Sequence, residues 1–174
     1  MNMNKKDELL LKNLFSANRQ TVTEAITEIK ESGNSNLIPG LIEIYYSSAD
    51  NEINKMIYSI LAELKYTSAV PLIIEAIQNE KYADIRESLI KICWENGLDY
   101  TPYISLFTDL VVSGDFMTAF EAFTVIENME GSIPEEKVEE NVVKLKKAVK
   151  VADKEKSKFL TDLISIIQQL KLQE

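Results

Sequence analysis

The chain contains no histidine and only one cysteine, Cys93. Without histidine there is no imidazole to act as a general base, to complete a Ser-His-Asp or Cys-His arrangement, or to bind a metal. One cysteine can build neither an internal disulfide nor a zinc or iron–sulfur site. The sequence also lacks the glycine-rich loops that bind phosphates. We therefore expect a protein that is not an enzyme and that uses no cofactor or metal.

Long apolar runs, glycine and proline are also scarce. No stretch approaches the roughly 18 apolar residues that span a bilayer, and the run from Leu9 to Leu11 is too short for a signal peptide. The lone cysteine favours a reducing compartment, and its place beside the apolar Ile92 predicts a buried side chain rather than a reactive thiol. These features predict a cytoplasmic protein without a membrane partner.

The composition is that of a folded chain. Hydrophobic residues make up 45% and charged residues 27% of 174 residues, which is too apolar for a disordered protein. Five glycines and four prolines are too few for a loop-rich fold. No segment shows the alternation of apolar and polar residues that is typical of strands. The expected fold class is all-α.

Three of the four prolines mark an internal repeat. Pro39, Pro71 and Pro102 lie 32 and 31 residues apart, and each precedes an apolar run. Proline suits the first turn of a helix, where its missing N–H has no partner in any case. A second apolar pattern begins 14 residues after each proline, with the spacing i, i+3, i+4, i+7 of one helical face. It comprises Ile53, Met56, Ile57 and Ile60; Ile85, Ser88, Leu89 and Ile92; Phe116, Ala119, Phe120 and Phe123; and, one repeat upstream, Val22, Ala25, Ile26 and Ile29.

The segments between these patterns are predicted to form tight turns. The polar stretches 48–51, 79–84 and 113–115 each end near an aspartate suited to an N-cap. Gly33, Gly97 and Gly131 follow the second helices, where a left-handed C-cap favours glycine. The sequence thus predicts an α-solenoid of about five stacked antiparallel helical hairpins, about ten helices, in a single domain over 1–174. The hairpins are expected at residues 6–33, 36–65, 68–97, 101–131 and 134–172.

The last hairpin departs from the repeat. Its second apolar pattern starts at Leu160, which is 26 residues after Pro134 rather than 14. We expect its first helix to be about three turns longer, and the hairpin to act as a cap on the stack.

The repeated segments resemble HEAT repeats over roughly residues 18–131. The resemblance rests on residues 36–64, on Ala69-Val70-Pro71-Leu72-Ile73, and above all on Asp84-Ile85-Arg86. In that family the first helix begins near a proline, and the second begins with an acidic residue followed by an apolar–Arg pair. The family's arginine position holds Asn54 in the first unit and Met117 in the third. HEAT and armadillo-like repeats imply a curved binding surface and no particular activity.

A binding surface follows from the helical geometry. If each second-helix pattern faces the core, residues rotated away from it point outward, and in a HEAT-like stack they line the concave side. The outward rows read Glu24, Glu28 and Glu31; Lys55, Ser59 and Ala62; Glu87, Lys91 and Trp94; Thr118, Ala122 and Val125. The predicted partner-binding residues are Glu24, Glu28, Glu31, Tyr58, Ala62, Glu87, Ile90, Lys91, Trp94 and Val125.

This surface has an acidic end and an apolar middle around Trp94. An exposed tryptophan in an apolar patch is typical of an interface anchor, although near its helix end Trp94 could instead fold onto the next hairpin. The leading hypothesis is a non-catalytic scaffold or adaptor for another protein or peptide, for example an amphipathic basic helix lying in a groove.

A rival hypothesis is a nucleic-acid-associated HEAT-like protein of DNA-repair type. Its basis is the segment 144–158, with seven lysines against Asp153 and Glu155. A net charge of −9 repels phosphates, and no aromatic residue accompanies the lysines before Phe159, so a solvated helix end is the favoured interpretation. Homo-oligomerisation through an end of the stack is a further open alternative. The lysines are Lys144, Lys146, Lys147, Lys150, Lys154, Lys156 and Lys158.

Overall fold

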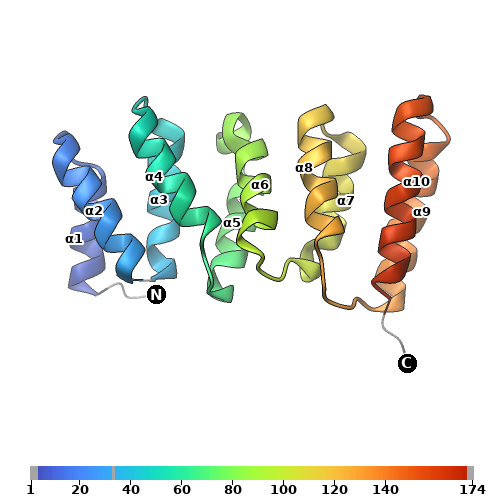
Figure 1. Cartoon of the computed structure of the whole chain (residues 1–174), viewed down its shortest axis with the longest axis horizontal. Coiled ribbons are helices and arrows are strands. Elements are labelled where there is room, and N and C mark those ends of the chain that lie inside the picture. Colours follow the sequence, from blue (N-terminus) through green and yellow to red (C-terminus); the bar gives the residue numbers. More distant parts are fainter. Residues whose placement is uncertain (1–3, 33, 172–174) are drawn as a thin grey trace. The chain divides into compact units, whose positions relative to one another are not determined.

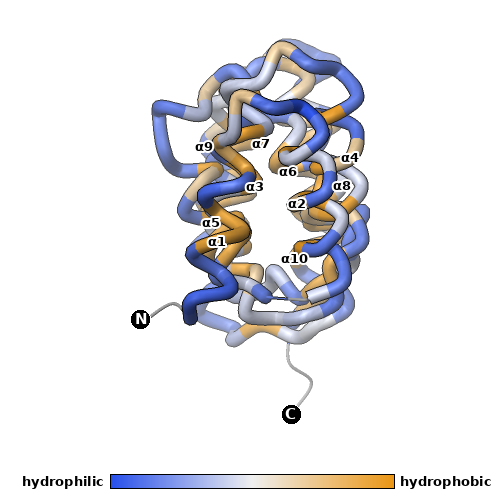
Figure 2. The backbone as a smooth tube through the Cα atoms, turned by 90° about the vertical axis from the view of Figure 1, so that its left-hand side faces the viewer, coloured by the Kyte–Doolittle hydropathy of each residue, from blue (hydrophilic) through white to orange (hydrophobic). Residues whose placement is uncertain are grey.

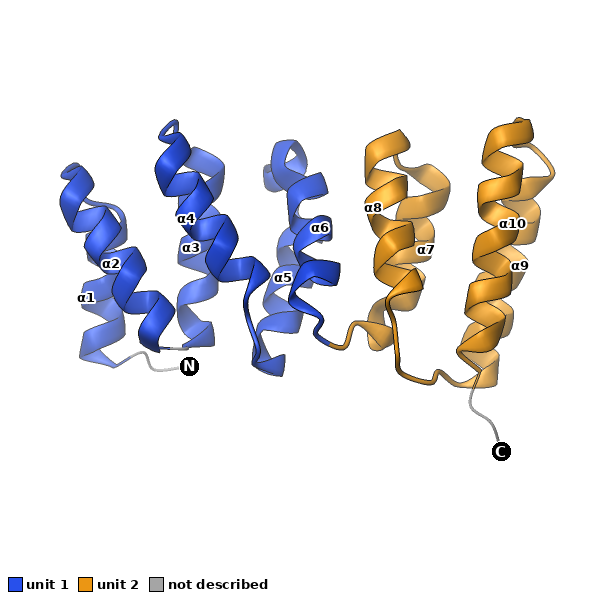
Figure 3. Cartoon of the chain, viewed as in Figure 1, with its two compact units in different colours: residues 1–98 blue, residues 99–174 orange. Residues whose placement is uncertain are grey.

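The protein is all-helical. The computed structural model describes residues 4–32 and 34–171, and within these ranges it contains ten α-helices, four short 3₁₀-helices and no strand. An isolated β-bridge joins Ile133 to Lys171. The predictions of an all-α fold and of about ten helices are confirmed. The chain divides into two compact units, residues 1–98 and 99–174, shown in blue and orange in Figure 3.

Unit 1 consists of three helical hairpins in two layers (Figure 1). Helix α1 packs on α3 and α3 on α5, while in the second layer α2 packs on α4 and α4 on α6. Three 3₁₀-helices, at Ser35–Leu37, Thr67–Ala69 and Glu80–Ile85, precede α3, α5 and α6. The α-helices are α1 (Lys5–Leu14), α2 (Arg19–Ser32), α3 (Ile38–Ser47), α4 (Asn51–Ala62), α5 (Val70–Gln78) and α6 (Arg86–Asn96).

Unit 2 repeats this arrangement with two hairpins. Helix α7 packs on α9 and α8 on α10, after a 3₁₀-helix at Thr101–Tyr103. In both units the hydrophobic residues of the odd and even helices lie on the sides that face each other (Figure 2). The helices are α7 (Ile104–Ser113), α8 (Phe116–Glu127), α9 (Glu135–Val149) and α10 (Lys154–Gln169).

The proline and apolar patterns predict unit 1 well. Pro39 and Pro71 are the second residues of α3 and α5, as expected, and Pro102 lies in the 3₁₀-helix before α7. All four predicted residues of α2 are buried, and so are Ile53, Ile57 and Ile60 of α4 and Leu89 and Ile92 of α6. The other predicted core residues of these two patterns, Met56, Ile85 and Ser88, are only half-buried. The predicted burial of Cys93 is also confirmed.

The predicted buried face of α8 is wrong. Of its four residues only Ala119 is buried, whereas the side chains of Phe116 and Phe120 are 80% and 47% exposed. The residues that α8 buries are Ala119, Glu121, Ala122, Val125 and Ile126. The helix is therefore rotated relative to the orientation that spacing from the proline predicts.

The reason is the position of the N-cap. Asp50, Asp115 and Asp153 cap α4, α8 and α10, and the residues seven, ten and fourteen positions after each cap are buried. The buried residues of α10 occupy the same positions after the cap as those of α4, although they lie further from the preceding proline, Pro134. Asp115 lies 13 residues after Pro102, whereas Asp50 lies 11 residues after Pro39, because Pro102 precedes α7 in a 3₁₀-helix while Pro39 lies inside α3. A shift of two residues turns a helix by about 200°. The buried residues are Ile57, Ile60 and Leu64; Ala122, Val125 and Met129; and Leu160, Leu163 and Ile167.

The other turn predictions have mixed outcomes. Gly97 is the left-handed C-cap of α6, with φ of 64°, but Gly131 caps nothing, since α8 ends at Glu127 with Asn128 as its C-cap. Asp84 lies inside the 3₁₀-helix Glu80–Ile85 rather than at an N-cap. Gly33 and the expected end of the last hairpin at residue 172 lie outside the described residues.

Helix α9 is longer than the other first helices, but by less than predicted. It has 15 residues against 10 in α7, an excess of about one and a half turns rather than three. Most of the remaining distance in sequence between Pro134 and Leu160 arises because α10 begins at Lys154, six residues before Leu160.

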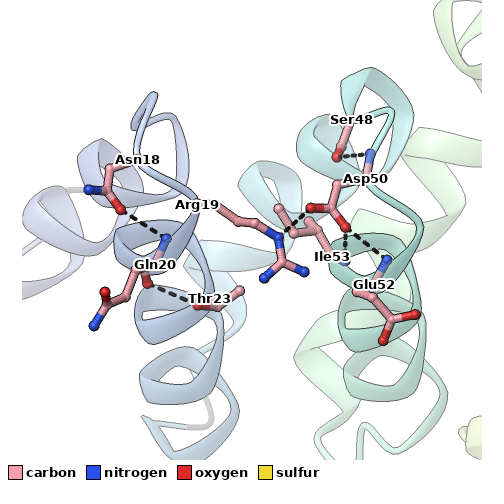
Figure 4. Close-up of polar contacts among 8 residues, drawn as sticks. All are labelled: Asn18, Arg19, Gln20, Thr23, Ser48, Asp50, Glu52 and Ile53. Carbon is pink, nitrogen blue, oxygen red and sulfur yellow. Dashed lines mark hydrogen bonds and ion pairs between the residues drawn. The ribbon is translucent and has the colours of Figure 1, made fainter.

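A polar contact joins the first two hairpins of unit 1 (Figure 4). Asp50 caps α4 by accepting hydrogen bonds from the backbone N–H groups of Glu52 and Ile53, at 2.9 and 3.2 Å. Its Oδ2 accepts a further bond from Nε of Arg19, at the start of α2, at 2.6 Å. The bond from Arg19 and the backbone bonds hold the pKa of Asp50 below its usual value of 3.8.

We predict that Asp50→Ala destabilises the protein more than Asp50→Asn, because asparagine still caps the helix but loses the pairing with Arg19. Since the folded state lowers the pKa of Asp50, its ionic contribution is complete above the ordinary pKa and is lost as pH falls through the folded-state value. The stability difference between wild type and Asp50→Asn should therefore shrink between pH 7 and pH 3 in urea unfolding. Asp115→Asn is the control, because Asp115 caps α8 through the backbone N–H of Thr118; an equal loss there would contradict a role for Arg19.

Gly97 gives a second prediction. A Cβ placed at Gly97 would meet no atom within 4 Å beyond the adjacent residues, so Gly97→Ala should lose about 1 kcal/mol through the left-handed backbone alone. Asparagine tolerates this conformation better, and Gly97→Asn should lose less. Thermal unfolding of both variants checks the order; equal stability of the alanine variant and wild type would contradict it.

Candidate functional site

The predicted partner-binding residues of α4 and α6 lie on adjacent helices of unit 1. Tyr58 and Ala62 come from α4, and Lys91 and Trp94 come from α6, which packs along α4. All four are half-buried. The structure thus places these residues on two packed helices with part of each side chain accessible, and Trp94 is neither fully exposed nor part of the core.

Glu95, which was not among the predicted partner-binding residues, contacts both Tyr58 of α4 and Lys91 of α6. The hydroxyl of Tyr58 donates a 2.6 Å hydrogen bond to Oε2 of Glu95, and Nζ of Lys91 lies 3.8 Å from Oε1 of the same group. The i, i+4 spacing of Lys91 and Glu95 could have indicated their pairing. The bond between α4 and α6 restrains Tyr58 and so orders this part of the surface.

Two predicted residues are not at the surface. Ile90 is 0% exposed and Val125 is 3% exposed, so both belong to the core and the expected exposure is wrong. Ile90 directly follows the buried Leu89 on α6, where the buried face is wider than one stripe. Val125 is buried because α8 is rotated as described above. Ala122, in the same predicted row, is buried for the same reason.

The acidic end of the predicted surface is present on α2. Glu24, Glu28 and Glu31 are exposed and line a shallow hollow together with residues of α1 and α2. Lys6 of α1 pairs with Glu28 at 3.0 Å. Helix α2 packs on α4, and Glu87 at the start of α6 is exposed as predicted. In the residues that the structure describes, no group of histidine, cysteine or acidic side chains could hold a metal ion.

Tyr46 and Tyr82 form a second aromatic cluster in unit 1, and their side chains contact other residues of the same unit. Glu43 of α3 accepts bonds from Lys81 at 2.5 Å and from the hydroxyl of Tyr82 at 2.8 Å, and the ring of Tyr46 lies edge-on to Tyr82. Burial, together with the bond to Glu43, raises the pKa of Tyr82 to about 12. These contacts attach the 3₁₀-helix Glu80–Ile85 to α3, so we assign the cluster a structural role.

The lysine-rich segment spans the end of α9 and the start of α10. Lys144 pairs with Asp109 of α7 at 2.5 Å, and Nζ of Lys156 donates to the carbonyl oxygen of Val112 at 3.0 Å. Two of its lysines therefore contact the rest of unit 2. Within the described ranges, no helix is long and apolar enough to cross a membrane.

The comparisons with known proteins identify no family. No family model matches the chain, and no curated protein is significantly similar to it. A solved structure described as an engineered protein is similar with a TM-score of 0.49 and 16% sequence identity, over 95% of this chain and 80% of that one.

The bond between Tyr58 and Glu95 can be tested by a double-mutant cycle. Tyr58→Phe and Glu95→Ala should each lower the free energy of unfolding by about 1 kcal/mol, and the double variant should lose less than the sum. Lys91→Ala is the control, because a surface ion pair as long as 3.8 Å contributes little. Additive losses in urea unfolding would show that the bond contributes no coupling.

Proposed function

We propose that the chain is a non-catalytic scaffold or adaptor of the HEAT-like, armadillo-like type, which acts in the cytoplasm and holds another protein. Its binding surface, the α4–α6 surface, comprises Tyr58, Ala62, Lys91 and Trp94. The observation that carries the proposal is that Trp94 and Tyr58 are both half-buried, on two helices that pack on each other. Large aromatic side chains that are partly pre-ordered lose little entropy on binding and often dominate interface energetics.

The charges nearby indicate the chemistry of the partner. Exposed carboxylates of α2 and Glu87 lie in the same unit, and the chain has a net charge of −9. A complementary partner carries lysine or arginine next to an apolar anchor, as on one face of an amphipathic basic helix. A phosphate backbone would be repelled by the net charge, and Lys144 and Lys156 already have contacts within unit 2.

Affinity capture with matched variants tests this proposal. Trp94→Ala should weaken retention of a cytosolic partner at least tenfold while circular dichroism and melting temperature stay close to wild type. Phe15→Ala is the control, because that side chain is 55% exposed but lies outside the α4–α6 surface.

Retention that is equal for wild type and Trp94→Ala would contradict binding through Trp94. An equal loss for Phe15→Ala would also contradict it, because the effect would then not be specific to this surface. A folded triple variant with Glu24, Glu28 and Glu31 changed to glutamine tests the acidic contribution, and it should weaken capture most at low salt.

A further inference from the structure

The rotation of α8 exposes an aromatic face on unit 2. Phe116, Met117 and Phe120 are 80%, 44% and 47% exposed, and the rings of the two phenylalanines stack with centroids 6.4 Å apart. Three large apolar side chains within five residues form a patch of the kind that soluble proteins use for recognition.

The patch continues into a cleft between α8 and α10. Phe116 and Ala119 of α8 and Phe159 of α10 supply its apolar lining, and its volume is about 360 Å³. Phe159 stacks on Phe123 of α8 with centroids 4.4 Å apart, and this contact restrains the ring of Phe159. The cleft is at the small end of the ~300–1,000 Å³ range of ligand pockets, a size that suits one or two side chains of a peptide rather than a large cofactor.

The charged residues that line the cleft are mostly acidic. Three carboxylates line it, from Asp115, Asp153 and Glu155. The only lysine among the described lining residues, Lys156, already donates to the carbonyl oxygen of Val112 at 3.0 Å. Asp115 is an N-cap, and the backbone bond from Thr118 holds its pKa below the usual value.

We propose that the α8–α10 cleft, lined by Phe116, Ala119, Phe159, Asp115, Asp153 and Glu155, binds a peptide segment of another protein that carries an apolar side chain next to a lysine or arginine. The apolar side chain enters between Phe116 and Phe159. The cation lies against the carboxylates, or over the exposed ring of Phe116.

The same charges argue against other occupants. A second copy of this chain would bring like carboxylates together, on molecules that each carry a net charge of −9. An anionic lipid surface would face the same repulsion. The proposal concerns unit 2 and does not depend on the α4–α6 surface of unit 1.

The test is selection of random twelve-residue displayed peptides on the immobilised full chain, followed by titration of synthetic copies. Enriched peptides should combine an aromatic or aliphatic residue with lysine or arginine. Their affinity should fall at least tenfold in Phe116→Ala and several-fold in Glu155→Lys, and should weaken as salt is added. Val151→Ala, at a side chain that is 88% exposed and outside the cleft, should bind as wild type does.

Several outcomes would overturn the proposal. They are enrichment of acidic peptides, enrichment of no peptide that depends on Phe116, and self-association or binding to phosphatidylcholine vesicles that Phe116→Ala abolishes. The Trp94→Ala variant separates this site from the α4–α6 surface. Peptides lost with Trp94→Ala but kept by Phe116→Ala would support the proposed function and reject the cleft.

Discussion

Burial of apolar stripes between two helix layers is the interaction on which each unit depends. A lone hairpin leaves one side of its stripes in water, so α3 and α4 require α1 and α2 on one side and α5 and α6 on the other. Full burial of a side chain such as Ile57 contributes about 1.5–3 kcal/mol. Polar contacts such as that of Arg19 with Asp50 help to align neighbouring hairpins, because they join the start of a helix in one hairpin to a helix cap in the next.

The N-cap of each second helix decides which residues enter that core. An aspartate that accepts backbone hydrogen bonds determines the residue at which the helix begins. The helical period then determines the direction in which each later side chain points. In α4, α8 and α10 the residues at the same positions after the cap are buried. One consequence is functional. In α8 the cap places Val125 in the core and Phe116 and Phe120 in solvent, which creates a surface where a stripe of core residues was expected.

Under the proposed function, both surfaces use one kind of chemistry in different units. Each presents aromatic side chains beside carboxylates, with Trp94 and Tyr58 near glutamates in unit 1 and Phe116 near Asp115 and Glu155 in unit 2. Both therefore select for partners that combine apolar and basic groups. In each case internal contacts restrain the aromatic residues, through Glu95 for Tyr58 and through Phe123 for the cleft, which reduces the entropy lost on binding.

Local signals in the sequence determined the all-α class, the helix starts at Pro39 and Pro71, the caps at Asp50 and Gly97 and the buried face of α2, because each depends on neighbouring residues and a helical period. The tertiary structure decided the placement of Pro102 in a 3₁₀-helix before α7, the burial of Ile90, the bond from Tyr58 to Glu95 and the cleft beside Phe159. These features depend on turn geometry and on the packing of the neighbouring helices. Repeat spacing cannot supply them, because it does not fix where each proline lies relative to its helix, and a shift of two residues reverses the face that the following helix presents.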